Sequence, residues 1–220
     1  METLHNLDEG DLHAAYRLGG YYLEGRYVRQ NIPKALYYYQ LAGEAGIADA
    51  YNRLGHLYWE EEYGIAQDYA KALSYFEKGA ALGDSNTAHL AGDLLYFGAE
   101  GIQPDYQRAF DYYDQTDLAT GSHHALAKYK QAEILYRGLL RDLTIEDFAE
   151  AYRLLLLAAE HGDLLAIDAL DHWSYEAALA EAAARHAKAA EVELVREPSD
   201  SSEPTELNEL NESNEEKGAY

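Results

Sequence analysis

A segment of 37 residues repeats along this chain, and this period constrains the fold more than any other feature. The stretch KALYYYQLAGEAG begins at Lys34, the similar stretch KALSYFEKGAALG begins at Lys71, and a third copy, RAFDYYDQTDLATG, begins at Arg108. A fixed period of roughly 20 to 50 residues is typical of repeat proteins, in which each unit packs on its neighbours. The sequence therefore predicts an array of similar units.

Each copy begins with a short entry motif that precedes a helix. The motif reads YVRQNIPKA, GIAQDYAKA, GIQPDYQRA and, less closely and after an insertion, LTIEDFAEA. A short polar side chain at such a point can accept hydrogen bonds from the free amides of the first helical turn. We interpret these residues as helix-start residues rather than as acidic ligands: Asn31, Asp68, Asp105 and Asp147.

Glycines mark where these helices end, because glycine readily adopts the left-handed conformation that terminates a helix. The first such helix is expected at Ala35 to Ala45, and the third is expected to be one residue longer than the second and to reach Gly121. The predicted terminators are Gly46, Gly83, Gly121 and Gly162.

A second helical pattern precedes each entry motif. Ala14, Leu18, Gly19 and Tyr22 follow the spacing i, i+4, i+5, i+8, which lies on one helical face, and Ala50, Leu54, Gly55 and Tyr58 repeat it. In the third copy the Leu-Gly pair becomes Ala91-Gly92 or Gly92-Asp93, and in the fourth it becomes Gln131-Ala132. Each unit is thus a pair of antiparallel helices that must stack on its neighbours to bury its apolar face.

These residues resemble the Sel1-like repeat, a relative of the tetratricopeptide repeat with a longer loop between its helices. The resemblance covers roughly residues 10 to 170. It implies an all-α fold, a right-handed α-solenoid of about four to five helical hairpins. The Ala-rich segment after Gly162 predicts a longer C-terminal capping helix, and the Ser-, Glu-, Asn- and Pro-rich end of the chain predicts a disordered acidic tail. We expect the solenoid at 1–190 and the tail at 191–220, with units near 10–46, 47–83, 84–121, 122–162 and a partial, capping unit at 163–190.

The chain is strongly acidic. It has 17 Lys and Arg against 40 Asp and Glu, a formal net charge of −23, and 48% hydrophobic residues. Such a surface repels nucleic acids and anionic membranes, so a partner selected by electrostatics should be a basic protein. Cysteine is absent from the sequence, and it contains neither a secretory signal pattern nor a membrane-spanning apolar run. A cytoplasmic location is expected.

Catalytic patterns are not found in the sequence. The nine histidines include the adjacent pair His123-His124, whose side chains would point about 100° apart on a helix. A solvated helix end is the simpler explanation of Glu60, Glu61 and Glu62, and a polar outer face is the simpler explanation of Asp168, Asp171 and His172. We therefore expect no enzyme activity, no cofactor and no metal.

The 21 tyrosines have two interpretations. Tyr22, Tyr38, Tyr58, Tyr75 and Tyr113 occupy repeat positions and are expected in the core. Tyr16, Tyr21, Tyr51 and Tyr129 lie off the small-residue stripe, where partial exposure for partner binding and extra packing between hairpins are equally expected.

In solenoids of helical hairpins the first helix of each unit lines the concave surface. Residues on these helices that lie off the packing stripe are the candidate partner-binding residues. They are His13, Arg17, Tyr21, Glu24, Arg53, His56, Leu57, Glu60, His89, Asp93 and Lys130.

Three hypotheses for function follow. The first is a non-catalytic adaptor that binds a protein partner on the concave surface. The second is a bacterial immunity protein that neutralises a basic toxin such as a nuclease, since an acidic inhibitor gains association rate by electrostatic steering. The third, an enzyme with a site in the groove, is remote. The sequence leaves the oligomeric state, monomer or weak dimer, open.

Overall fold

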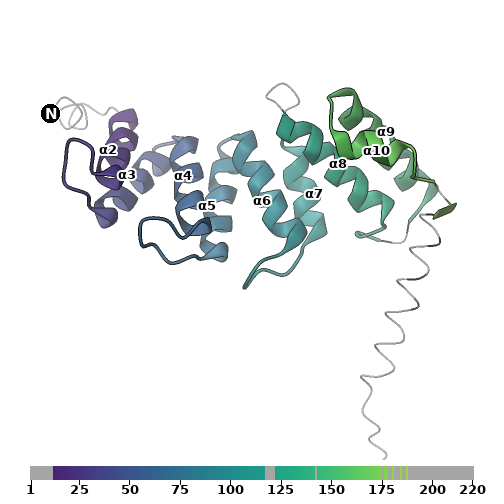
Figure 1. Cartoon of the computed structure of the whole chain (residues 1–220), viewed down its shortest axis with the longest axis horizontal. Coiled ribbons are helices and arrows are strands. Elements are labelled where there is room, and N and C mark those ends of the chain that lie inside the picture. Colours follow the sequence, from purple (N-terminus) through teal and green to yellow (C-terminus); the bar gives the residue numbers. More distant parts are fainter. Residues whose placement is uncertain are drawn as a thin grey trace, which may run out of the picture. The chain divides into compact units, whose positions relative to one another are not determined.

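The computed structural model describes residues 12–116, 122–141 and 143–174, together with residues 176, 177, 180, 184 and 187. Contacts divide the chain into two units, Met1–Ala183 and Ala184–Tyr220, and the helices described below belong to the first. They follow one another in chain order along this unit (Figure 1). The predicted tail at 191–220 lies outside the described residues.

The regular elements of the described residues are helices, which pair into hairpins as predicted. The first helices of the hairpins are α2 (Leu12–Glu24), α4 (Ala48–Trp59), α6 (Ser85–Phe97) and α8 (Ser122–Tyr136). The second helices are α3 (Ile32–Glu44), α5 (Tyr69–Ala81), α7 (Tyr106–Asp114) and α9 (Ile145–Glu160), and α10 (Leu164–Leu170) follows. Each helix packs on the next, and α8 also contacts α6 and α10. The predicted all-α solenoid is confirmed.

The second helices start where the entry motifs predict. Asn31, Asp68 and Asp105 are N-caps whose side chains accept the backbone amides of Lys34, Lys71 and Arg108 at 3.0, 2.9 and 3.1 Å. Because Asn31 is the cap itself, α3 begins at Ile32, three residues before the predicted start. Asp84 and Asp163 cap α6 and α10 in the same way, which the sequence patterns did not reveal.

Three of the four predicted glycines follow the helix ends in the left-handed conformation. Gly46, Gly83 and Gly162 have φ values of 98°, 85° and 86°, directly after the C-caps of α3, α5 and α9. Gly121 lies outside the described residues.

A glycine in the first helix of each of the first three hairpins faces an aromatic ring of the second helix. A Cβ placed on Gly19 would lie 2.7 Å from Tyr39, one on Gly55 would lie 2.3 Å from Phe76, and one on Gly92 would lie 2.6 Å from Tyr113. Contacts this short are not available to real side chains, so the rings fill the space that the missing Cβ leaves. Each hairpin is therefore closed by a ring packed against a backbone.

This packing settles the register of the later copies. Gly92 contacts Tyr113 as Gly55 contacts Phe76, so the third copy uses the Ala91-Gly92 alternative. In the fourth copy Ala132 and Leu155, both fully buried in one core cluster, occupy the corresponding positions. There the methyl group of Ala132 takes up space that glycine leaves free in the other copies, and Leu155, which is smaller than an aromatic side chain, packs in place of the ring.

The two adjacent glycines of α2 allow a direct test of this packing. Gly19→Ala should lower the free energy of unfolding by about 1–3 kcal/mol, because its Cβ overlaps the Tyr39 ring. Gly20→Ala, whose Cβ would meet its nearest atom at 3.5 Å, should be neutral or gain up to about 1 kcal/mol from helix propensity. Urea unfolding measures both. Equal effects of the two substitutions would contradict the proposed role of the ring contact.

The third hairpin departs from the prediction, because α7 ends at Asp114 rather than near Gly121. Beyond it, Thr116 donates its hydroxyl to the Tyr113 carbonyl at 2.7 Å, a local bond that competes with helix continuation. Gln131 of α8, 1% exposed, donates to the Phe110 carbonyl at 3.1 Å, and buried Lys128 bonds to Gln131 and Asp114. The unusual Gln in the fourth copy thus joins α8 to the end of α7.

The segment after Asp163 also differs from the prediction of one longer helix. Helix α10 ends at Leu170, and the backbone amide of Trp173 then bonds to the Ala169 carbonyl at 2.9 Å in a turn. The turn stacks the Trp173 indole on the Tyr136 ring, with centroids 4.1 Å apart. The half-buried indole thus packs against α8 just after the helix ends. The rest of the predicted cap is largely outside the described residues.

The fourth entry motif forms a capping box rather than a simple cap. Thr144 is the N-cap of α9, its hydroxyl accepts the Asp147 amide at 3.1 Å, and the Asp147 carboxylate accepts the Thr144 hydroxyl at 2.7 Å. Arg141 also pairs with this carboxylate. Burial alone would raise the pKa of Asp147, but the bonds from Thr144 and Arg141 outweigh it and lower the pKa below its usual value.

This lowered pKa predicts a pH dependence of stability. Because the folded-state pKa lies below the unfolded-state value, the carboxylate stabilises the fold above about pH 4 and loses this effect as the pH falls through the folded-state pKa. Asp147→Asn should therefore lower the free energy of unfolding by about 1 kcal/mol at pH 7. The difference from wild type should shrink towards zero near pH 2 to 3 in urea unfolding.

Asp105→Asn is the matched control. Asn and Asp are nearly equivalent N-caps, so this substitution should change the stability by no more than a few tenths of a kcal/mol. An Asp147→Asn effect that stayed constant down to pH 2 would show that the carboxylate charge is not the stabilising feature.

Candidate functional site

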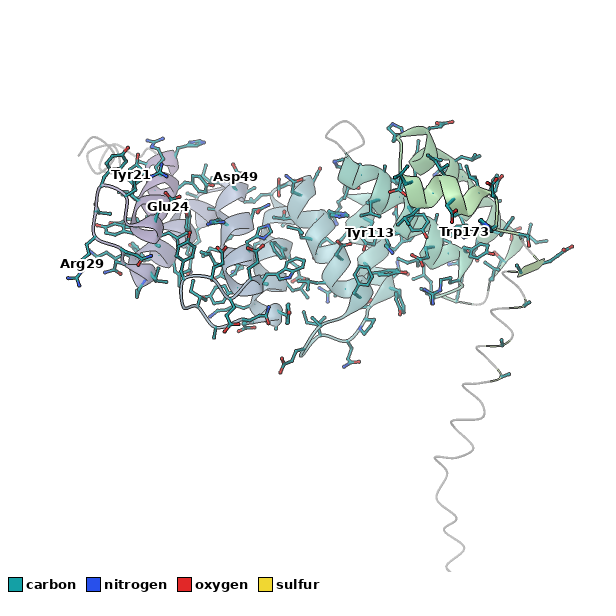
Figure 2. The ribbon with its side chains drawn as sticks, viewed as in Figure 1. Tyr21, Glu24, Arg29, Asp49, Tyr113 and Trp173 are labelled. Atoms are coloured by element: carbon teal, nitrogen blue, oxygen red, sulfur yellow. The ribbon has the colours of Figure 1, made fainter. Side chains whose placement is uncertain are left out.

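The candidate site is the surface formed by the first helices α2, α4, α6 and α8, called here the first-helix face. The structure places the predicted residues on these four helices, but it divides them into exposed, half-buried and buried groups. The α2 residues are accessible: Arg17 is exposed, Glu24 is exposed and pairs with Arg26 at 2.9 Å, and Tyr21 is half-buried against Tyr27. Figure 2 shows Tyr21 and Glu24 on α2.

Helix α4 and its C-cap residue Glu60 contribute three accessible residues to this face. Arg53 is half-buried beside the Tyr39 hydroxyl, and burial raises the pKa of Tyr39 to about 12 although Arg53 acts in the opposite direction. His56 Nδ1 lies 3.1 Å from the carboxylate of exposed Glu60, and the His56 ring stacks on Trp59. These groups provide both signs of charge and an aromatic surface.

Leu57 was wrongly predicted as a binding residue. Its exposure is 0%, and it belongs to the core cluster that also contains Leu54 and Tyr51. One helical position corresponds to about 100° of rotation, so a residue next to His56 points into the core. Of the two interpretations left open for Tyr51, packing between hairpins holds, because Tyr51 is buried and its ring packs against Gly43 of α3.

A pair of α4 variants separates the two environments. Leu57→Ala should lower the free energy of unfolding by about 2–5 kcal/mol, since it empties a fully buried site. Glu60→Ala, at the exposed end of the same helix, should stay within about 0.5 kcal/mol of wild type. Urea unfolding monitored by circular dichroism gives both values. A Leu57→Ala variant as stable as Glu60→Ala would place Leu57 on the surface.

His89 of α6 was also wrongly predicted as accessible, since it is only 5% exposed. Its Nε2 lies 3.5 Å from the Asp93 carboxylate, and its ring lies 5.9 Å from that of Tyr113. Asp93 is half-buried and accepts the Tyr113 hydroxyl at 2.7 Å. Burial, reinforced by this carboxylate, raises the pKa of Tyr113 far above its usual value. His89 is thus a packing residue beneath Asp93.

Lys130 of α8 is half-buried rather than free. Its ammonium group lies 4.6 Å from the ring centroid of Tyr96 and 5.1 Å from that of Phe97, and it bonds to Glu133 at 3.0 Å. The same combination of lysine and tyrosine occurs in earlier hairpins, with Lys34 over Tyr22 and Lys71 over Tyr58.

The repeat tyrosines are less buried than predicted. Tyr113 is buried, whereas Tyr22, Tyr38, Tyr58 and Tyr75 are half-buried. They form stacked pairs, with Tyr22 on Tyr38 at 5.6 Å and Tyr58 on Tyr75 at 5.8 Å between ring centroids. Lys34 and Lys71 cover part of the Tyr22 and Tyr58 rings, so these rings are only partly accessible to a partner.

Two hollows lie beside the accessible residues. The first, of about 340 Å³, lies between α4 and α6 and is lined by Asn52, His56, Asn86, His89 and Leu90. The second, of about 390 Å³, lies where α4, α5 and α6 meet, beside Trp59 and Phe97. Sequence reasoning missed Asn52, Asn86, Trp59 and Phe97, because a hollow depends on residues more than 30 positions apart.

The sequence also contains two groups of possible metal ligands, Asp168 with Asp171 and His172, and the pair His123-His124. His172 Nδ1 bonds to the Asp168 backbone carbonyl at 2.8 Å and lies 3.9 Å from its carboxylate. His124 is buried, and the His123 side chain lies outside the described residues. Among the described residues, no three His, Asp or Glu side chains form a group that could hold a metal ion.

The four hairpins coincide with four matches to a known family of repeats. The family model of the Sel1 repeat matches residues 12–47, 48–84, 87–115 and 122–163. The chain belongs to the Sel1 repeat family. Sel1 repeats are generally protein-interaction modules and are typically non-catalytic. Among curated proteins, none matches this chain.

Two solved structures share the fold. A Sel1 repeat protein from Oxalobacter formigenes is 24% identical, with a TM-score of 0.53 over 73% of this chain and 62% of that one. A protective antigen present in uropathogenic Escherichia coli strains, which displays an SLR fold, is 23% identical, with a TM-score of 0.62 over 84% of this chain and 39% of that one. The chain thus spans less than two thirds of each of these Sel1-type proteins.

Among the described residues, no helix combines the length and apolar character that crossing a membrane requires.

Proposed function

We propose that this Sel1 repeat chain binds a protein partner on the first-helix face, the side predicted to be concave. The observation that carries the proposal is the hollow between α4 and α6, where Asn52, Asn86 and His56 surround about 340 Å³ of open space. Side-chain amides offer both donors and acceptors, so they can bond to the main chain of an extended partner segment without requiring a particular sequence.

The surroundings of this hollow suit a protein partner more than a small molecule. His56 Nδ1 lies 3.1 Å from the Glu60 carboxylate and its ring stacks on half-buried Trp59, while Arg53 adds a positive charge on the same helix. Interfaces characteristically combine aromatic and arginine anchors with a polar rim. Tyr21 and Glu24 add an aromatic ring and a carboxylate on α2, the first helix of the first hairpin (Figure 2).

The net charge of −23 favours a basic partner. An acidic surface accelerates association with a basic protein, and dissolved salt screens this effect. The same charge supports a second candidate function, that of a bacterial immunity protein that covers a basic toxin such as a nuclease. Both candidates are non-catalytic, and they differ in whether the unbound partner is toxic.

The test begins with affinity capture of the tagged full chain from its native host at low salt, followed by mass spectrometry. Binding of the recovered protein is then measured by calorimetry with wild type and with an Asn52→Ala, Asn86→Ala double variant. The double variant should weaken binding at least about tenfold, since several interface hydrogen bonds of about 1 kcal/mol each are removed. Alanine favours the helix, so the fold should persist.

Tyr37→Ser is the matched control, because Tyr37 is exposed on the second helix α3. This substitution should leave the affinity unchanged. Equal affinity for wild type and the double variant would refute binding at the first-helix face. An affinity that stays constant from low to moderate salt would refute electrostatic selection of the partner. Toxicity of the partner when produced alone would favour the immunity protein.

A further inference from the structure

The hollow between the second and third hairpins combines aromatic walls with carboxylates. Trp59 of α4, Tyr69 of α5 and Phe97 of α6 contribute rings, while Asp93 and Glu100 contribute negative charge. We call this hollow, of about 390 Å³, the Trp59 pocket. It adjoins the first-helix face, because Asp93 belongs to both.

The internal repeat provides a counterpart of this pocket one hairpin further along. The glycine packing aligns Gly55 with Gly92, and Gly92 with Ala132. Trp59 therefore corresponds to Tyr96, and Asp93 corresponds to Glu133, so both junctions keep an aromatic ring and a carboxylate. The remaining positions differ: Leu90 and Phe97 of the third copy correspond to Lys130 and Arg137 of the fourth.

At the junction of the third and fourth hairpins the chain supplies its own cations. Lys130 lies 4.6 Å from the Tyr96 ring centroid and 3.0 Å from Glu133, and Arg137 lies 3.5 Å from Glu133. Burial and Glu133 raise the pKa of the Tyr96 hydroxyl, which Arg137 opposes, so ring, carboxylate and cations are in direct contact. An aromatic face and a carboxylate together attract a cation.

The equivalent positions of the third copy hold apolar side chains instead of cations: Phe97 lines the Trp59 pocket, and Leu90 lines the hollow between α4 and α6. Phe97 is 64% exposed, and its side chain lines the pocket without occupying it. Glu100 adds a second carboxylate on a tight turn, which a bridge holds between Ala99 and Ile102 through backbone bonds of 3.0 and 2.9 Å. The acidic and aromatic elements are thus positioned before any ligand arrives.

We propose that the Trp59 pocket receives an arginine side chain of the protein partner. A planar guanidinium group stacks on aromatic faces while its N–H groups bond to carboxylates, which matches Trp59 and Phe97 beside Asp93 and Glu100. Asp93 Oδ1 accepts the Tyr113 hydroxyl and Oδ2 lies 3.5 Å from His89 Nε2, which fixes the orientation of the carboxylate, and the oxygens keep lone pairs for a further donor. The inference rests on the proposed function and specifies the chemistry of its anchor residue.

The experiment uses the full chain labelled with ¹⁵N and the probe N-acetylarginine amide, with N-acetylcitrulline amide as its neutral analogue. The chain has two tryptophans, so the indole signal of Trp59 reports on the pocket and that of Trp173 serves as an internal control. The arginine probe should shift the Trp59 signal in a saturable manner and bind at least about fivefold more tightly than the citrulline probe. The Trp173 signal should not move.

Two substitutions complete the test. Phe97→Arg places the fourth-hairpin cation in the pocket, at an exposed position where the fold tolerates it, and should abolish the Trp59 response. Glu100→Gln should weaken the response several-fold, whereas Glu146→Gln, exposed at the start of α9, should not. Equal shifts with both probes, or an unchanged response in Phe97→Arg, would overturn the inference.

The partner recovered by capture separates this inference from the proposed function. If the Asn52, Asn86 double variant weakens partner binding but Phe97→Arg does not, the arginine anchor is refuted and the first-helix interface stands. If neither variant weakens partner binding, the first-helix interface itself is refuted, and the anchor with it.

Discussion

The close approach of helix backbones to aromatic rings is the constraint on which this fold depends. Gly19, Gly55 and Gly92 leave no room for a Cβ against Tyr39, Phe76 and Tyr113. Each ring also packs one turn after a fully buried alanine of the second helix, at Ala35, Ala72 and Ala109. Because these contacts set the distance and rotation of the two helices, they also decide which residues of the first helix face solvent.

Regular packing makes the exceptions informative. The fourth hairpin replaces glycine and ring by Ala132 and Leu155, and it replaces the preceding leucine by the buried Gln131, which bonds to the Phe110 carbonyl at the end of α7. Buried polar groups are tolerated only when they are bonded, so the early end of α7 and the glutamine in α8 are complementary. The third and fourth hairpins are thus joined by the hydrogen bond from Gln131 to Phe110, which a leucine at position 131 could not form.

The sequence predicted the local features of the fold better than the surface of the site. N-caps and terminal glycines depend on neighbouring residues, so Asp68, Asp105, Gly83 and Gly162 were assigned correctly. Exposure depends on helix rotation, and an error of one position placed Leu57 on the surface although it lies in the core. The Trp59 pocket could not be predicted, since it requires knowing which side chain is missing beside Asp93 as well as which are present.

The comparison of junctions also changes the interpretation of the acidity of this chain. A large negative charge is often explained by solubility alone, but Glu133 is neutralised by Lys130 and Arg137 of the same helix, beside the Tyr96 ring. The equivalent Asp93 lines the Trp59 pocket, and the repeat positions of those two cations hold Phe97, which lines the same pocket, and Leu90, which lines the neighbouring hollow. A repeat protein can therefore form a recognition site where one unit lacks the internal cation that its neighbour has, because the repeated scaffold around that position is the same. On this view partner specificity arises from the difference between units, while stability arises from their similarity.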